Sequence, residues 1–247
     1  MQLLVLSFVI GAAGAGLMAR FGLQLGLSDD PGLRSSHHTS TPRGGGIGFF
    51  LVVIVAGVLV DMPTLLILSG VLVALLSFLD DRIGLSPKPR LFFQFLCAGM
   101  ALWAIAPVLG SQTLTLLWTP VFLIFIVGTA NFYNFMDGIN GIAGITGLIA
   151  FGLAALFGQY QGEGNLALFA ACLSLACLGF LPFNIPRARV FMGDVGSVLL
   201  GFLFAGLVLL LASDLGSLLT MMAFLLPFYV DELTTMAMRL RSKENLF

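Results

Sequence analysis

The sequence predicts an all-α protein, a polytopic membrane helical bundle of about nine transmembrane helices. Hydrophobic residues make up 59% of the 247 residues and charged residues only 9%, whereas soluble domains carry about 25% charged residues. Segments such as Val121–Val127 are apolar at every position, which indicates helices because the strands of a membrane barrel alternate polar and apolar residues. The formal net charge of -1 provides no basic field for nucleic acid, so we expect no nucleic-acid partner.

Nine stretches approach the ~20 mostly apolar residues that a membrane-crossing helix needs. They lie near residues 1–19, 44–60, 62–79, 91–109, 113–131, 139–158, 165–183, 195–212 and 215–238. The first has no basic residue before it and Arg20 after it, the reverse of a cleavable signal peptide, so we retain it as a helix. The remaining residues leave no room for a soluble domain, and we expect one integral membrane domain over residues 1–247.

The basic residues lie on alternate loops. The odd-numbered loops and the end of the ninth stretch hold all eleven: Arg20, Arg34, Arg43, Arg82, Lys88, Arg90, Arg187, Arg189, Arg239, Arg241 and Lys243. Because positive residues stay on the cytoplasmic side, we expect these loops to be cytoplasmic and the N-terminus to lie outside. The polar segments 20–46, 80–91, 131–141 and 183–197 are then the expected site of any chemistry.

The first polar segment ends in Arg43, Gly44, Gly45 and Gly46. Successive glycine amides can form an anion-binding concavity, and an arginine adds a fork-shaped phosphate donor. The alternative is a flexible connector whose glycines only open the second span.

The second segment places Asp80 and Asp81 at the end of the third span. Acids are unfavourable at the negative, C-terminal end of a helix dipole, so this pair indicates a compensating cation, either Arg82 or a metal ion. A solvated helix cap is the alternative.

The third segment spaces Asn131, Asn134 and Asp137 by three residues, which predicts that they share one helix face within an apolar stretch. A lone polar residue there could simply bond a neighbouring helix, but three together indicate a site. In the fourth segment, Asp194 stands between glycines just before the eighth span. Its alternative is an N-cap, because a helix start also favours an acid.

The four segments together predict metal-assisted phosphoryl transfer at the cytoplasmic membrane surface. Carboxylates with few nitrogen or sulfur neighbours suit Mg²⁺ or Mn²⁺, and arginines beside a glycine-rich turn suit phosphates. The cysteines lie inside apolar runs without zinc-ligand spacing and are expected to pack in the core: Cys97, Cys172 and Cys177.

Four stretches carry a resemblance to a known family: RSSHHTSTPRGGG, FLDDRIGLSPKPRLFFQ, NFYNFMDGINGIAG and FNIPRARVFMGDVGS. In this order they resemble the polyprenyl-phosphate N-acetylhexosamine-1-phosphate transferases, the MraY/WecA-type superfamily, and most of all the O-antigen-initiating branch of glycosyltransferase family 4. The resemblance implies transfer of a sugar-1-phosphate from a UDP-N-acetylhexosamine to undecaprenyl phosphate at the bacterial inner membrane. UMP is released, Mg²⁺ is the cofactor, and the product starts a lipid-linked surface glycan such as O-antigen. A homodimer is compatible with it.

The resemblance also implies residue roles, carried over position by position. It makes Asp194 the first metal ligand, gives Asp80 or Asp81 the acceptor phosphate, and gives Asp137 a catalytic and metal-binding role beside the nucleotide. The implied substrate-binding residues are His37, Arg43, Gly44, Gly45, Arg90, Asn131, Asn134, Arg187 and Arg189.

Two departures from the family limit these expectations. Asn140 stands where many members have a second aspartate, and members continue into a histidine-bearing loop and further helices, whereas this sequence ends at Phe247. We therefore expect a truncated form with little activity alone. The main alternative function is a membrane transporter that uses the carboxylates as an ion or proton site. Transporters place such groups near the midplane, often in repeated halves, and neither feature is evident.

Overall fold

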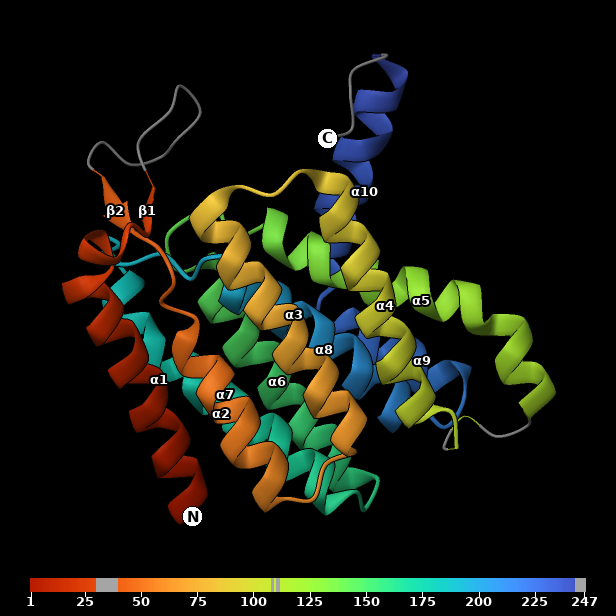
Figure 1. Cartoon of the computed structure of the whole chain (residues 1–247). Coiled ribbons are helices and arrows are strands. Elements are labelled where there is room, and N and C mark those ends of the chain that lie inside the picture. The colour runs from red at the N-terminus through yellow and green to blue at the C-terminus, as the bar shows by residue number, and fades with distance from the viewer. Residues whose placement is uncertain (30–39, 108, 110–111, 243–247) are drawn as a thin grey trace.

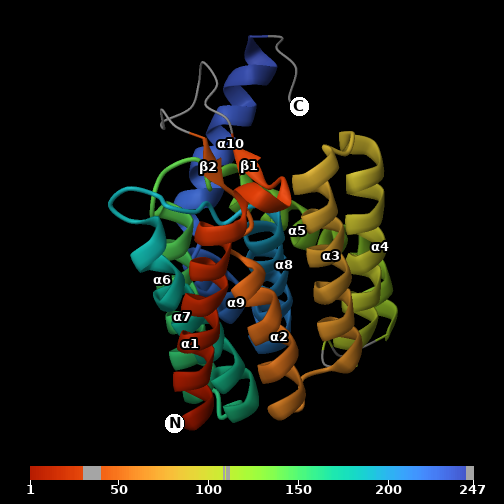
Figure 2. The same cartoon turned by 60° about the vertical axis from the view of Figure 1, so that its left-hand side comes forward.

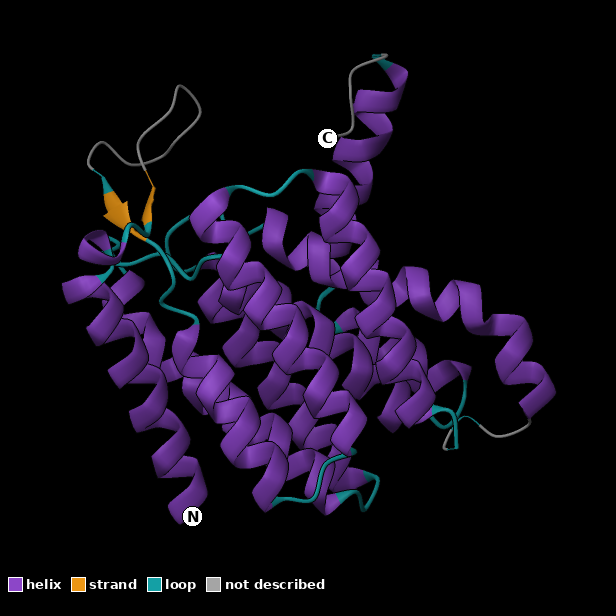
Figure 3. Cartoon of the chain, viewed as in Figure 1, coloured by secondary structure: helices purple, strands orange, loops and turns teal. Residues whose placement is uncertain are grey.

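The computed structural model describes residues 1–29, 40–107, 109 and 112–242. Figures 1 and 3 show a bundle of helices with one short hairpin. The helices are α1 (Gln2–Phe21), the short 3₁₀ helix η1 (Leu23–Leu25), α2 (Ile47–Leu59), α3 (Thr64–Ile83), α4 (Pro87–Ile105), α5 (Gln112–Phe135), α6 (Ile142–Tyr160), α7 (Gly164–Asn184), α8 (Asp194–Leu211), α9 (Leu215–Ala223) and α10 (Leu226–Arg241). The hairpin pairs β1 (Ser28–Asp29) antiparallel with β2 (Thr41–Pro42).

Helix α8 is the centre of the bundle. Every residue from Val195 to Leu211 is buried, as expected of a helix that is apolar on all sides. It packs against α2, α3, α4, α5, α6, α7 and α9. Helix α7 in turn packs against α1 and α6 (Figure 2). The first residue of this central helix is Asp194, so the packing of the core fixes the position of that carboxylate.

The structure confirms a polytopic helical bundle but not the count of nine spans. Six of the described helices are long and apolar enough to cross a membrane, or seven if α9 and α10 form one bent span. Helix α2 is shorter, with thirteen residues. Helix α4 lies outside the six as well, and its first turn contains Pro87, Lys88, Pro89 and Arg90.

The ninth predicted span, residues 215–238, is not one continuous helix. It consists of α9 and α10, which meet at an angle of 82°. Pro227 lies in the first turn of α10, where a residue without an N–H group can begin a helix but not continue one. Figures 1 and 2 show the end of α10 projecting beyond the bundle.

The described parts of the four polar segments lie at one end of the bundle, as the charge pattern predicts. This end, here called the site end, carries the hairpin and the α3–α4, α5–α6 and α7–α8 connections, whereas the N-terminus lies at the opposite end (Figures 1 and 2).

Candidate active site

The first and fourth polar segments are joined by backbone hydrogen bonds at the site end. The Phe191 N–H donates to the Pro42 carbonyl at 2.8 Å, and the amides of Gly45 and Gly46 donate to the carbonyls of Phe191 and Met192, each at 2.9 Å. These two glycine amides therefore hold the segment that leads into Asp194, rather than pointing outward as an anion-binding concavity.

Glycines allow the two segments to approach this closely. A Cβ atom on Gly46 would lie 2.3 Å from the Cα atom of Gly196, a backbone contact that cannot move aside. Gly193 has a φ of 72°, and a Cβ atom there would lie 2.8 Å from Asp81 Oδ2. The glycines around Asp194 thus bring its helix start against α2 and α3.

We predict that Gly46→Ala separates these segments and lowers the melting temperature of the purified protein by several degrees. Gly46 has an ordinary helical φ of -68°, so the effect would come from the steric contact with Gly196 and not from backbone strain. Gly99→Ala in α4 is the matched control, because a Cβ atom there meets nothing within 4 Å. Equal melting temperatures for the two variants would contradict the close packing.

Arg90 connects two of the predicted carboxylates. Its Nη1 atom lies 3.2 Å from Asp80 Oδ2 and 3.7 Å from Asp194 Oδ2. Asp80 is buried, and its other oxygen accepts a hydrogen bond from the Leu85 amide at 2.6 Å. The sequence indicated that a cation, Arg82 or a metal ion, compensates the Asp80–Asp81 pair. In the structure Arg90, at the start of α4, offsets the charge of Asp80 through a direct ion pair.

Asp81 faces the start of α8. Its Oδ2 atom accepts a hydrogen bond from the Val195 amide at 3.2 Å, so the positive end of the α8 dipole stabilises the carboxylate. Its Oδ1 atom is buried and has no hydrogen-bond partner among the described residues. A buried carboxylate oxygen without a partner is costly and is free to accept a ligand.

Asn134 and Asp137 approach the same carboxylates from the end of α5. Asn134 lies within hydrogen-bonding reach of Asp194, and its Oδ1 atom accepts a hydrogen bond from the Ser197 hydroxyl at 2.6 Å. Helix α5 ends at Phe135, so Asp137 lies in the following turn, where its amide donates to the Asn134 carbonyl at 3.1 Å.

The charge around Asp137 is predominantly negative. Burial and then the carboxylates of Asp194 and Asp81 raise the pKa of Asp137 well above its ordinary value, while Arg43 lowers it. Arg43 itself forms an ion pair with Asp29 of β1. The carboxyl of Asp137 is therefore one whose ionisation a bound cation would favour.

We predict that Asp137→Asn stabilises the metal-free protein, by a few degrees in melting temperature measured in EDTA. A carboxyl whose pKa is raised by folding binds more protons in the folded state, so stability is lost as pH rises from its ordinary pKa through the raised value. The gain should therefore be larger at pH 8 than at pH 5. A gain that is independent of pH would show that the effect does not come from this charge.

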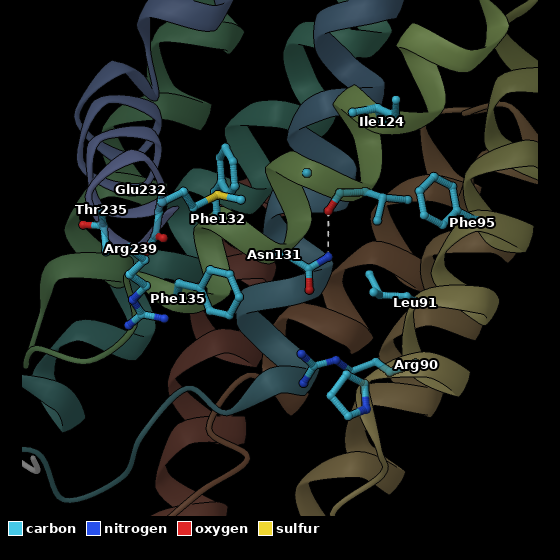
Figure 4. A pocket seen from close by; sticks show the side chains of 14 residues that line it. Arg90, Leu91, Phe95, Ile124, Asn131, Phe132, Phe135, Glu232, Thr235 and Arg239 are labelled. Carbon is cyan, nitrogen blue, oxygen red and sulfur yellow. Dashed lines mark hydrogen bonds between the residues drawn. The ribbon is translucent and has the colours of Figure 1, made fainter. Parts of the chain in front are cut away.

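An apolar groove of about 560 Å³ opens beside the carboxylates, between α4, α5 and α10. Figure 4 shows Arg90 and Asn131 on its α4 and α5 walls. Its lining residues are Pro87, Arg90, Leu91, Phe95, Ile124, Val127, Gly128, Asn131, Phe132, Phe135, Glu232, Thr235, Met236 and Arg239. Asn131, which lines this groove, donates to Gln94 Oε1 at 2.7 Å and to the Val127 carbonyl at 2.8 Å.

The remaining predicted residues have different surroundings. His37 lies outside the described residues. Arg187 is exposed, and Arg189 lies over the Phe183 ring at 4.9 Å and donates to the Pro182 carbonyl at 2.7 Å. Neither arginine contacts the carboxylates of Asp80, Asp81, Asp137 or Asp194 among the described ion pairs.

Three polar residues of the site were not predicted from the sequence. Gln94 is buried and accepts a hydrogen bond from Asn131, and the Ser197 hydroxyl donates one to Asn134. Asn184 forms hydrogen bonds to both the α5–α6 and the α7–α8 connections. Asn184 accepts from the Gly141 amide at 2.6 Å and donates to the Val190 carbonyl at 3.0 Å. All three stand in apolar helices, where a polar side chain usually has a partner, and that signal could have identified them.

The donor set fits a hard divalent cation. The described residues contain no cluster of three His, Cys, Asp or Glu side chains already spaced for a metal. However, the partnerless Oδ1 of Asp81 and the mutual repulsion of Asp81, Asp137 and Asp194 favour a cation between them. Oxygen ligands of this kind suit Mg²⁺.

Residues 63–212 match the family model described as glycosyl transferase family 4. The chain belongs to this family. The match covers the second, third and fourth polar segments, and with them all four predicted carboxylates. This membership favours the transferase over the transporter that the sequence left as an alternative.

The chain is also similar to several curated proteins. It is 31% identical over 215 residues to decaprenyl-phosphate N-acetylglucosaminephosphotransferase of Mycobacterium tuberculosis. The matched region covers 74% of this chain and 53% of that protein. It is 27% identical over 209 residues to phospho-N-acetylmuramoyl-pentapeptide-transferase of Staphylococcus saprophyticus (73% and 65%). It is 29% identical over 203 residues to the probable undecaprenyl-phosphate N-acetylglucosaminyl 1-phosphate transferase of Bacillus subtilis (75% and 56%). The chain thus spans between about half and two thirds of these relatives.

Proposed function

We propose that this chain transfers N-acetylhexosamine-1-phosphate from a UDP-sugar to undecaprenyl phosphate, releasing UMP. One observation supports this most strongly: Arg90 lines the apolar groove and also contacts Asp80 and Asp194. A polyprenyl chain in the groove would therefore bring its phosphate to the carboxylates. The names of the relatives, which include undecaprenyl- and decaprenyl-phosphate transferases, support the same acceptor class.

In the proposed reaction, an oxygen of the acceptor phosphate attacks the phosphorus that bears the sugar. The bond from that phosphorus to the oxygen bridging the two donor phosphates breaks, and UMP leaves with the electron pair. The product is a lipid-linked pyrophosphoryl sugar, which we propose as the first intermediate of a surface glycan such as O-antigen. Because an anion attacks a dianionic pyrophosphate, positive groups must offset the repulsion.

Arg90 and Arg43 are the two arginines placed to offset this charge. Arg90 lines the groove and contacts the carboxylates, where the attacking phosphate would enter, and Arg43 lies close enough to Asp137 to lower its pKa. Asp80 keeps Arg90 in position through their 3.2 Å contact. Asp81, Asp137 and Asp194 would hold Mg²⁺, or Mn²⁺, which supplies charge neutralisation and orients the donor pyrophosphate.

The proposed location is the bacterial inner membrane, with the site end cytoplasmic and the N-terminus outside. Nucleotide sugars are water-soluble, so the donor would reach the carboxylates from the aqueous side, whereas the acceptor tail would stay in lipid along α4, α5 and α10. The basic residues of the site end support this orientation.

The proposal is tested with membranes that contain the chain, undecaprenyl phosphate, Mg²⁺ and a panel of UDP-N-acetylhexosamines. Mass spectrometry measures whether a lipid-linked pyrophosphoryl sugar and UMP form with any donor, and their formation would support the proposal. Since the chain spans only part of its relatives, binding is measured as well: a UDP-sugar with Mg²⁺ should raise its melting temperature. The absence of both turnover and metal-dependent donor binding would contradict the proposal.

A further inference from the structure

A second hollow of about 480 Å³ lies at the site end, beside the end of α1. This α1 hollow is lined by Gly16, Ala19, Arg20, Ser40, Thr41, Pro42, Phe183, Ala188 and Arg189. None of the four carboxylates of the candidate active site lines it, and it shares no residue with the apolar groove. Its chemistry is therefore separate from the proposed transfer reaction.

Two arginines give the α1 hollow its charge. Arg189 is held over the Phe183 ring and bonded to the Pro182 carbonyl, which fixes its guanidinium in one position. Arg20 lies in the last turn of α1 with its guanidinium 5.3 Å from the ring of Phe21. Within the described ranges, no carboxylate lines the hollow or pairs with either arginine.

Arginine side chains that have no carboxylate partner among the described residues can bind a phosphate, because their planar N–H donors match its oxygens. Ser40 adds a hydroxyl to the wall. The volume of the hollow, about 480 Å³, is enough for a group larger than one phosphate.

The position of the hollow indicates a lipid. Helix α1 is one of the helices long and apolar enough to cross a membrane, and large apolar side chains on its outer surface are exposed, including Leu17 at 54% and Phe21 at 38%. Acyl chains that pack on this surface would place their headgroup at the level of Arg20. Basic pockets at the ends of membrane helices bind anionic headgroups in this way.

We propose that the α1 hollow binds the headgroup phosphate of an anionic phospholipid, whose acyl chains lie along α1. Arg20 and Arg189 hold the phosphate oxygens, and the rest of the hollow accommodates the alcohol of the headgroup. The family resemblance implies that Arg189 holds substrate phosphates, and that role stays a prediction. In the structure Arg189 lines the α1 hollow together with Arg20.

The test uses the purified chain in a non-ionic detergent, titrated separately with phosphatidylglycerol, phosphatidylcholine and inorganic phosphate. Native mass spectrometry counts bound lipid, and the melting temperature reports binding, since a ligand of the folded state stabilises it. The variant is Arg20→Gln with Arg189→Gln. Arg241→Gln is the control, because it removes an equally exposed arginine that lines neither hollow nor groove.

Wild type and the Arg241→Gln control should bind one phosphatidylglycerol at least about tenfold more tightly than the double variant. Phosphatidylcholine and inorganic phosphate should bind weakly to all three. Equal phosphatidylglycerol binding by wild type and the double variant would overturn the proposal. So would tight binding of inorganic phosphate, which would indicate a soluble anion. If the double variant is unfolded in detergent without added lipid, the proposal is tested on the wild type instead. Wild type should then bind phosphatidylglycerol more tightly than phosphatidylcholine, and equal binding of the two lipids would reject the site.

Discussion

Asp194→Asn should weaken Mn²⁺ binding by at least ~100-fold, because even substitutions around metal ligands cost 10–100-fold in affinity. Asp194 begins the buried helix α8 and faces the carboxylates of Asp81 and Asp137. Asparagine keeps the shape of the side chain and removes its charge, so the fold should be unchanged while the cation loses a ligand. Any sugar-phosphate transfer by the wild type should fall to background in the variant. Binding is measured by electron paramagnetic resonance of free and bound Mn²⁺.

The matched control for this substitution is Asp61→Asn. Asp61 lies in the α2–α3 connection, remote from the site end, with a positive φ of 55°. Asparagine tolerates that conformation about as well as aspartate, so this variant makes the same chemical change without touching the site. Loss of Mn²⁺ binding in both variants would indicate a general charge effect and contradict a metal role for Asp194.

Arg90→Gln should lower the stability of the fold by ~3–5 kcal/mol, the usual cost of removing one partner of a buried ion pair. The Asp80 side chain is 7% exposed and that of Arg90 20%. Without Arg90, Asp80 would keep a buried charge that, among the described residues, accepts a hydrogen bond from the Leu85 amide. Chemical unfolding in detergent measures this loss. Arg82→Gln is the control, since Arg82 is exposed on the neighbouring turn.

A double substitution separates the charge effect from lost packing. If the cost comes from an uncompensated carboxylate, adding Asp80→Asn to Arg90→Gln should recover a large part of the stability. Arg90→Lys should also retain more stability than Arg90→Gln, because the cation remains. A double variant less stable than Arg90→Gln by the full cost of Asp80→Asn would show that the two side chains are not coupled.

The sequence predicted the position of the site better than its internal contacts. The distribution of arginines placed all four polar segments at one end of the bundle, and the structure has them there. The spacing of Asn131, Asn134 and Asp137 predicted one helix face, but α5 ends at Phe135, so Asp137 lies beyond the helix. Spacing indicates a shared face only while the helix continues, and Gly138 directly after Asp137 is a residue that commonly follows a helix end.

Contacts between distant segments could not be predicted from the sequence, because they depend on turns and loops that have no periodic pattern. Asp80 and Arg90 are ten residues apart, yet their contact depends on the turn between α3 and α4. The approach of Gly46 to Gly196 joins residues 150 positions apart, and glycine-rich loops have no periodicity from which such pairing follows. The break between α9 and α10 could have been predicted, because Pro227 lies within the apolar stretch.

The most direct test of metal-assisted phosphoryl transfer is whether a cation bound by Asp81, Asp137 and Asp194 also coordinates the donor phosphates. Mn²⁺ bound to the wild-type chain with a UDP-N-acetylhexosamine is examined by electron–nuclear double resonance for coupling to phosphorus. We predict phosphorus coupling in the wild type and in Asp61→Asn, and none in Asp194→Asn. Bound Mn²⁺ without phosphorus coupling in the wild type, or coupling that persists in Asp194→Asn, would contradict a metal-assisted phosphoryl transfer at this site.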